Sequence, residues 1–87
     1  MKILYSPQFA RDYRKLPYEI KEKAKEREKI FIENPFDQRL KTHRLHGRFR
    51  EFWAFSVDYR FRIIFRFLGE KEVRFYAVDD HSVYKRF

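Results

Sequence analysis

The sequence predicts an α+β fold in which an N-terminal strand and a helical hairpin pack on an antiparallel sheet of about four strands. Apolar residues before residue 35 recur at helical spacing, whereas those after Phe49 alternate with polar residues, as in strands. Most of the aromatic residues fall in this alternating half. There is no repeat or linker-like segment, so we expect one domain over residues 1–87.

The first elements are predicted from short-range signals. Lys2 to Tyr5 is typical of a short strand, and Ser6-Pro7 is typical of a helix N-cap followed by proline at the first helical position. The spacing predicts a helix over 7–16 that ends before Pro17. Its apolar face consists of Phe9, Tyr13 and Leu16.

Pro17 then opens a second predicted helix, which ends at Asn34-Pro35. Ile20, Ala24 and Phe31 mark its apolar face. The charged residues between them, including Lys23 and Lys25, are interpreted as a solvated face.

Three strands are predicted in the second half, over Arg50 to Val57, Arg60 to Phe67 and Glu72 to Val78. The connections are short enough for hairpins, so the strands should form a meander. Odd-numbered positions are mostly apolar and should face the core. The opposite face should carry Arg50, Arg60, Arg62, Arg66 and Arg74, with Phe52 and Tyr76 among them.

The charge balance favours a polyanionic partner. Lys and Arg number 21 against 13 Asp and Glu, for a net charge of +8, and the segment from Arg39 to Arg48 adds a basic rim. Nucleic acid and an acidic protein both fit this charge, although arginines interleaved with aromatic rings are typical of RNA-binding surfaces. The absence of cysteine excludes disulfides and thiol chemistry. No apolar run is long enough for a signal peptide or membrane span.

Histidine is the one residue type here that titrates near neutral pH, and His43, His46 and His81 are the candidates for acid–base chemistry. His43-x-x-His46 is a weak metal pattern without cysteine or a helical context, so we expect no metal. RNA cleavage by the substrate's own 2′-hydroxyl requires a base, a cation and an acid. His43, Arg62 and His81 are chemically suited to these roles.

Five segments in order resemble the RelE/ParE toxin superfamily, and most closely its RelE/YafQ-like mRNA interferases. They are Ile3 to Phe9, Asn34 to Asp37, Leu40 to Gly47, Phe52 to Phe65 and His81 to Lys85. The resemblance implies a RelE-like fold and a cytoplasmic toxin of a type II toxin–antitoxin pair. Such a toxin cleaves mRNA on the ribosome without metal or cofactor and is neutralised by its cognate antitoxin.

The resemblance also implies roles for individual residues. His81 matches the C-terminal catalytic histidine, a general acid, and Arg62 matches a strand arginine that contacts the scissile phosphate. His43 lies where relatives place a residue that assists proton transfer, and Tyr84 where an aromatic residue holds substrate. The expected RNA-binding residues are Lys41, Arg44, Arg48, Arg50, Arg60, Arg66 and Arg74.

Two alternatives remain open at this point. A ParE-like toxin would share the fold but bind gyrase without cutting RNA. An inactive homologue would bind antitoxin only. The second alternative is motivated by Asp79 and Asp80, which precede His81 where close relatives have Gly-Thr, and which would repel a phosphate.

Overall fold

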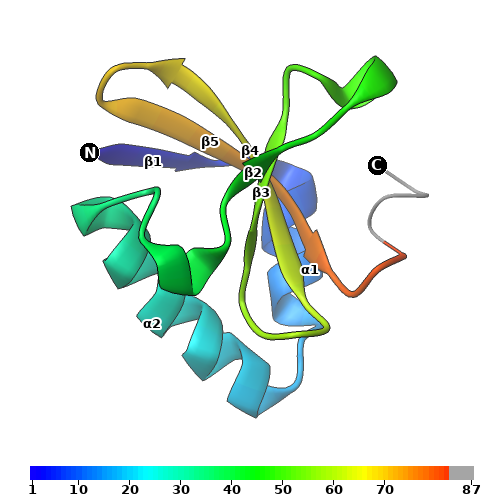
Figure 1. Ribbon diagram of the computed structural model, residues 1–87. Helices are drawn as coiled ribbons and strands as arrows, with labels where there is room; N and C mark the ends of the chain where they lie inside the picture. Colours follow the sequence, from blue (N-terminus) through cyan, green and yellow to red (C-terminus); the bar gives the residue numbers. More distant parts are fainter. Residues whose placement is uncertain (83–87) are drawn as a thin grey trace.

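The computed structural model describes residues 1–82 of the chain. The elements in chain order are β1 (Lys2–Tyr5), α1 (Pro7–Arg14), α2 (Tyr18–Glu33), the 3₁₀ turn η1 (Gln38–Leu40), β2 (His43–Arg44), the 3₁₀ turn η2 (Gly47–Phe49), β3 (Trp53–Ser56), β4 (Arg62–Gly69) and β5 (Glu72–Asp79). Figure 1 shows α2 below the sheet and the loop around η2 above it. No helix within residues 1–82 has the length and apolar character needed to cross a membrane.

The sheet has five strands in the order β1-β5-β4-β3-β2. The pairs from β2 to β5 are antiparallel, whereas β1 runs parallel to β5. The α+β class is therefore confirmed, but the expectation of about four antiparallel strands is wrong. The meander offers an open edge on either side, and β1 and β2 pair with these edges over a long sequence separation that local alternation does not reveal.

Both predicted helices form. Ser6 caps α1, because its Oγ accepts the Phe9 amide at 3.0 Å, and Pro7 occupies the first turn. The helix ends at Arg14 rather than at residue 16, and its last turn tightens into a bond from the Leu16 amide to the Tyr13 carbonyl. Helix α2 starts directly after Pro17.

The main core lies between the helices and the sheet, and Phe31 of α2 is at its centre. Phe31 has no exposed surface, and its ring lies 4.8 Å from Phe55, 4.9 Å from Phe65 and 5.6 Å from Phe75, between ring centroids. Stacked and edge-on rings in this range add attraction beyond area burial. Large rings thus provide the burial that so short a chain needs.

A second, smaller core lies on the other side of the sheet. It consists of Leu45, Ala54, Ile64 and Ala77, with Phe49 and Phe52 packed against it. The loop from β2 to β3, which carries η2, supplies Leu45, Phe49 and Phe52. The opposite face of the sheet is therefore partly covered rather than wholly solvated.

A β-bulge in β5 changes which residues face which side. Ile64 pairs with Ala77, yet Phe65 pairs with Phe75, so Tyr76 is the extra residue. Phe75 and Val78 consequently face the main core, while Ala77 faces the smaller one. The expectation that Val73, Phe75 and Ala77 share a face, with Val78 opposite, is wrong because the bulge shifts the alternation by one position.

The predicted strand boundaries also shift. The first predicted strand begins at Trp53 instead of Arg50, because the Arg50 amide donates to the Gly47 carbonyl in the η2 turn. The next strand begins at Arg62, since Arg60 and Phe61 belong to the β3–β4 turn, where both amides donate to the Asp58 carboxylate. The last strand extends to Asp79.

Replacing Phe31 should test the central role of this ring. We expect Phe31→Ala to lower the free energy of unfolding by about 3–5 kcal/mol, from lost burial and the cavity left behind. Urea titration followed by far-UV circular dichroism measures the change. The neighbouring Ile32 is 43% exposed, so Ile32→Ala should change stability by no more than about 0.5 kcal/mol. Equal losses in the two variants would contradict this account of the core.

Candidate nucleic-acid interface

The strand register places several predicted site residues on one face of the sheet. His43 pairs with Ala54, Ala54 with Ile64, and Ile64 with Ala77, so these four positions share a face. Arg62 is two residues from Ile64 on β4, about 7 Å along the strand, and has the same orientation. His43 and Arg62 therefore start from the same face of the sheet, which is the face covered by η2.

Arg62 lies at the start of β4, between Ser56 of β3 and Asp79 of β5. It is half-buried, and its Nη1 donates to the Asp58 carbonyl at 2.7 Å and to the Phe61 carbonyl at 3.2 Å. These two bonds hold the guanidinium beside the β3–β4 turn. A guanidinium fixed in this way is preorganised to donate to a phosphate.

His81 follows two residues after Asp79, the residue opposite Arg62. The backbone of this segment is turned by local bonds, because Asp79 accepts the Asp80 amide and Asp80 accepts the Ser82 amide, each at 2.9 Å. The pairing of Arg62 with Asp79 places the Arg62 backbone close to this exposed histidine. Arg62 therefore lies at the end of β4 that is next to the turn carrying His81.

Asp80 remains ionised near this histidine. The backbone amide of Ser82 lowers the pKa of Asp80, and the Ser82 hydroxyl and the positive charges of Arg60 and His81 lower it further. Asp80, Arg60 and His81 thus form one electrostatic group at the end of β5. The Asp80 carboxylate opposes the approach of a phosphate, whereas the Arg60 guanidinium attracts one.

The His43 ring is exposed, and its orientation defines its tautomer. Nδ1 lies 3.0 Å from the Lys41 carbonyl, which can only accept, so Nδ1 carries the proton in this bond. In the neutral ring Nε2 is then the lone-pair site. His43 is accordingly suited to act as a base through Nε2. Tyr84, the fourth predicted catalytic residue, lies outside the described residues.

A second basic cluster lies further along β4 and β5. Arg66 pairs directly with Arg74, and their guanidinium groups lie over the rings of Phe52 and Tyr76, 5.7 and 5.6 Å from the ring centroids. The two rings meet edge to face at 5.3 Å. Glu51 also makes an exposed ion pair of 3.4 Å with Arg66. Arginines and aromatic rings are therefore interleaved here as predicted.

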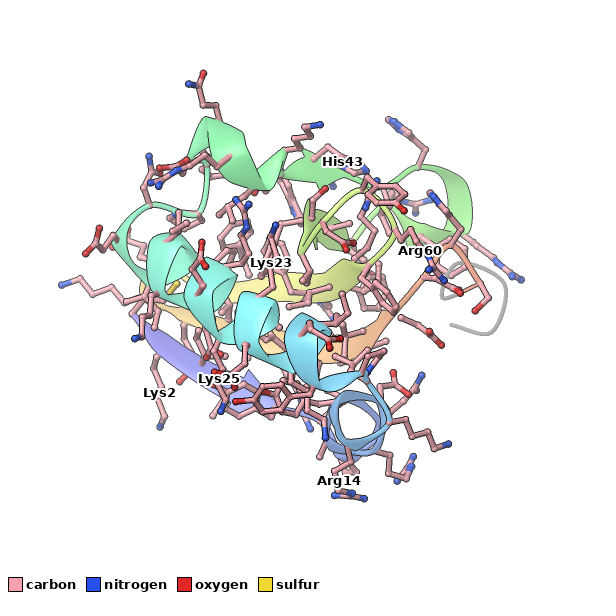
Figure 2. The ribbon with its side chains drawn as sticks, turned by 90° about the horizontal axis from the view of Figure 1, so that it is seen from below. Lys2, Arg14, Lys23, Lys25, His43 and Arg60 are labelled. Atoms are coloured by element: carbon pink, nitrogen blue, oxygen red, sulfur yellow. The ribbon has the colours of Figure 1, made fainter. Side chains whose placement is uncertain are left out.

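The remaining predicted RNA-binding residues do not join this cluster. Arg48 lies over Phe49 in η2, and the Arg44 Nε donates to the Arg50 carbonyl, so all three arginines belong to the segment from β2 to β3. Arg60 lies in the β3–β4 turn over Phe61. A single row containing Arg50 and Arg60 is thus wrong, because neither residue is in a strand. Figure 2 shows His43 and Arg60 on one side of the molecule and Arg14 on the other.

Two cations of α2 also lie beside Arg62, although the sequence did not single them out. Lys23 and Arg27, together with Arg39 and Lys41, line a hollow beside Arg62. Residues at i and i+4 share one side of a helix, so Lys23 and Arg27 point to the same side of α2. They lie next to Ala24, which faces the core. These two cations therefore do not belong to a wholly solvated face. Within residues 1–82, no three histidine or acidic side chains gather into a group that could hold a metal ion.

The fold and the arrangement of this face define a RelE-like α+β domain with a basic, aromatic-rich surface. Chains similar to it include YafQ from E. coli strain BL21(DE3), with 24% identity over 95% of this chain and 96% of that one and a TM-score of 0.78. A YoeB/ParE toxin from Agrobacterium tumefaciens shares 19% identity over 93% and 99% of the chains, with a TM-score of 0.79.

A third similar structure is the DinJ–YafQ toxin–antitoxin complex of E. coli, with 24% identity over 94% and 93% of the chains and a TM-score of 0.76. These likenesses confirm the RelE-like fold expected from the sequence. No family model and no curated protein matches the chain.

The rim of the basic face offers a test by titration. The Arg39 side chain and then its backbone amide donate to Asp37, which lowers the pKa of that carboxyl from 3.8 to about 2. Because the folded pKa is depressed, this interaction stabilises the fold above about pH 4 and is lost as the pH falls towards 2. We expect Arg39→Gln to raise the Asp37 pKa towards its ordinary value. NMR of the carboxyl carbon during a pH titration measures the change.

The matched control is Arg44→Gln, which removes an exposed arginine bonded to the Arg50 carbonyl instead. It should leave the Asp37 pKa unchanged. The same low Asp37 pKa in both variants would show that Arg39 is not the cause.

Proposed function

We propose that the chain is the toxin of a type II toxin–antitoxin pair, an endoribonuclease that cleaves mRNA on the ribosome in the cytoplasm without a metal ion. The observation that carries the proposal is the β4–β5 register. It pairs Arg62 with Asp79, two residues before His81, on the sheet face from which His43 also projects. The fold shared with YafQ and YoeB/ParE toxins supports the same assignment.

The proposed reaction uses the 2′-hydroxyl of the RNA as nucleophile. His43 takes the 2′-hydroxyl proton at Nε2, and the 2′-oxygen attacks the neighbouring phosphorus. Arg62 donates to the phosphoryl oxygens, where negative charge increases in the transition state. The bond to the 5′-oxygen then breaks and His81 protonates that oxygen, which leaves a 2′,3′-cyclic phosphate and a free 5′-hydroxyl. Tyr84 is proposed to hold the substrate.

The partner expected besides RNA is a cognate antitoxin. Charge complementarity favours an acidic or amphipathic segment laid over the arginine-rich face, where it would compete with RNA for Arg66 and Arg74. The solved relatives include complexes with the antitoxins DinJ and YefM, which supports a partner of this kind.

A second candidate function is antitoxin binding without RNA cleavage. It is favoured by one observation, the ionised Asp80 within electrostatic reach of His81. The two candidates differ in cells that express the chain alone. Cleavage predicts growth arrest and new 5′ ends on transcripts, whereas an inactive homologue predicts neither.

Replacing His81 and Arg62 should test the roles proposed for them. We expect His81→Gln and Arg62→Ala each to slow RNA cleavage on the order of 10²-fold or more, because each removes a group needed in the transition state. Both variants should relieve growth arrest while the thermal unfolding midpoint stays near that of the parent chain. Cleavage is measured by mapping transcript 5′ ends after induction.

Two matched controls separate these roles from general loss of charge. His46→Gln removes an exposed histidine that makes no capping bond in η2, and Arg14→Ala removes an exposed arginine at the end of α1. Both controls should stay toxic. Full toxicity of His81→Gln and Arg62→Ala would refute the assignment.

A further inference from the structure

A basic hollow of about 340 Å³ lies between α2, the segment from η1 to β2, and the β3–β4 turn. Five cations line it, namely Lys23, Arg27, Arg39, Lys41 and Arg62, against one carboxylate, Asp58. Asp58 Oδ1 is already bonded to the amides of Arg60 and Phe61, at 2.8 and 2.7 Å. Arg39 is paired with Asp37, so most of the positive charge in the hollow comes from the other four cations.

Two of these cations are held in place by bonds to the backbone. Arg27 is half-buried, with its Nη1 donating to the Arg39 carbonyl at 3.3 Å, and its Nε is buried without a hydrogen-bond partner. An unsatisfied buried donor is costly, so the Arg27 side chain is held here at the expense of one hydrogen bond. Arg62 is fixed by its bonds to the turn.

Lys41 also adopts an unusual backbone conformation. Its φ of 52° lies in the left-handed region, which residues other than glycine, asparagine and aspartate rarely adopt. It caps η1, and its amide donates to the Gln38 carbonyl. Glycine would adopt this conformation without strain. The chain has lysine here instead, which places a cation at the hollow at a cost in backbone energy.

An exposed aromatic ring borders the same hollow. Tyr59 lies in the β3–β4 turn, lines the hollow and is 81% exposed. An exposed ring next to fixed cations matches the two parts of a single-stranded nucleotide, because the base stacks on the ring while the phosphate binds the cations. An acidic peptide would satisfy the cations but has no comparable use for the ring. These observations favour RNA.

We propose that this hollow is a second phosphate subsite for single-stranded RNA, next to the phosphate bound at Arg62. Lys23, Arg27 and Lys41 bind the neighbouring phosphate, and Tyr59 stacks on a base beside it. The position of this subsite relative to the cut rests on the proposed function, whereas the binding itself does not require cleavage. Figure 2 shows Lys23 and Lys25 on opposite sides of α2, so these two lysines form a matched pair.

The test measures binding of a short fluorescent single-stranded RNA whose 2′-hydroxyls are all methylated, so that it cannot be cleaved. Fluorescence anisotropy gives the affinity at several salt concentrations. We expect the double variant Lys23→Gln/Arg27→Gln to bind roughly tenfold more weakly or worse, because it removes charge-assisted hydrogen bonds to the phosphate. The slope of log affinity against log salt should fall by about 0.7 for each phosphate that the variant no longer neutralises.

Two further variants test the other parts of the subsite. Tyr59→Leu should weaken binding about tenfold with the salt slope unchanged, because stacking is not ionic. Lys41→Gly removes a cation while relieving the left-handed backbone, so weaker RNA binding together with an undiminished thermal midpoint cannot come from unfolding. The control is Lys25→Gln, which should leave affinity and slope near those of the parent chain.

Three outcomes would overturn the proposal. Equal losses in Lys25→Gln and in the hollow variants would mean that only overall charge matters. Unchanged RNA affinity in the hollow variants would exclude the subsite. Unchanged RNA affinity together with loss of binding to a poly-glutamate peptide would instead assign the hollow to an acidic protein.

Failure of the proposed function is distinguishable from all of these. In that case His81→Gln would stay fully toxic while the hollow variants still showed weaker affinity for the methylated RNA.

Discussion

The pairing of β4 with β5, including its bulge at Tyr76, is the constraint on which the other features depend. On one side of the bulge the register places Arg66 opposite Arg74, and on the other side it places Arg62 opposite Asp79. The extra residue also reverses the faces of β5, so that the strand contributes Phe75 to the main core and Ala77 to the smaller one. A strand without this bulge would exchange buried and exposed side chains throughout the end of β5.

The outer edge of β5 needs separate support, because β1 pairs with it only as far as Phe75. Beyond that point Ser6 and α1 supply the partners. The Ser6 hydroxyl donates to the Tyr76 carbonyl at 3.0 Å, and Asp12 accepts the Val78 amide at 3.1 Å. Buried backbone groups need such partners, so α1 secures the end of the strand that leads to His81. A helix that belongs to the core thereby also positions a proposed catalytic residue.

Local signals in the sequence are sufficient to predict much of this structure and insufficient for the rest. The Ser6-Pro7 cap and the apolar stripe through Phe31 depend on residues close in sequence, so both helices are predictable. The parallel pairing of β1 depends on segments far apart in the chain that only folding brings together. No glycine marks the bulge at Tyr76 in the sequence. Lys23 and Arg27 have the same four-residue spacing as charged residues on any solvated helix face, so the sequence does not distinguish them.

The charged side chains of the domain add little to its stability, and some of them lower it while keeping the surface positive. Among residues 1–82 three ion pairs form, each with at least one partner well exposed, and such pairs contribute about 0–1 kcal/mol each. Arg66 facing Arg74 is a like-charge pair directly opposite in a sheet, which is destabilising. The rings of Phe52 and Tyr76 offset part of this cost while leaving the positive charge accessible. Any anion bound to this face relieves the remaining repulsion, so binding and folding stability are coupled through the same arginines.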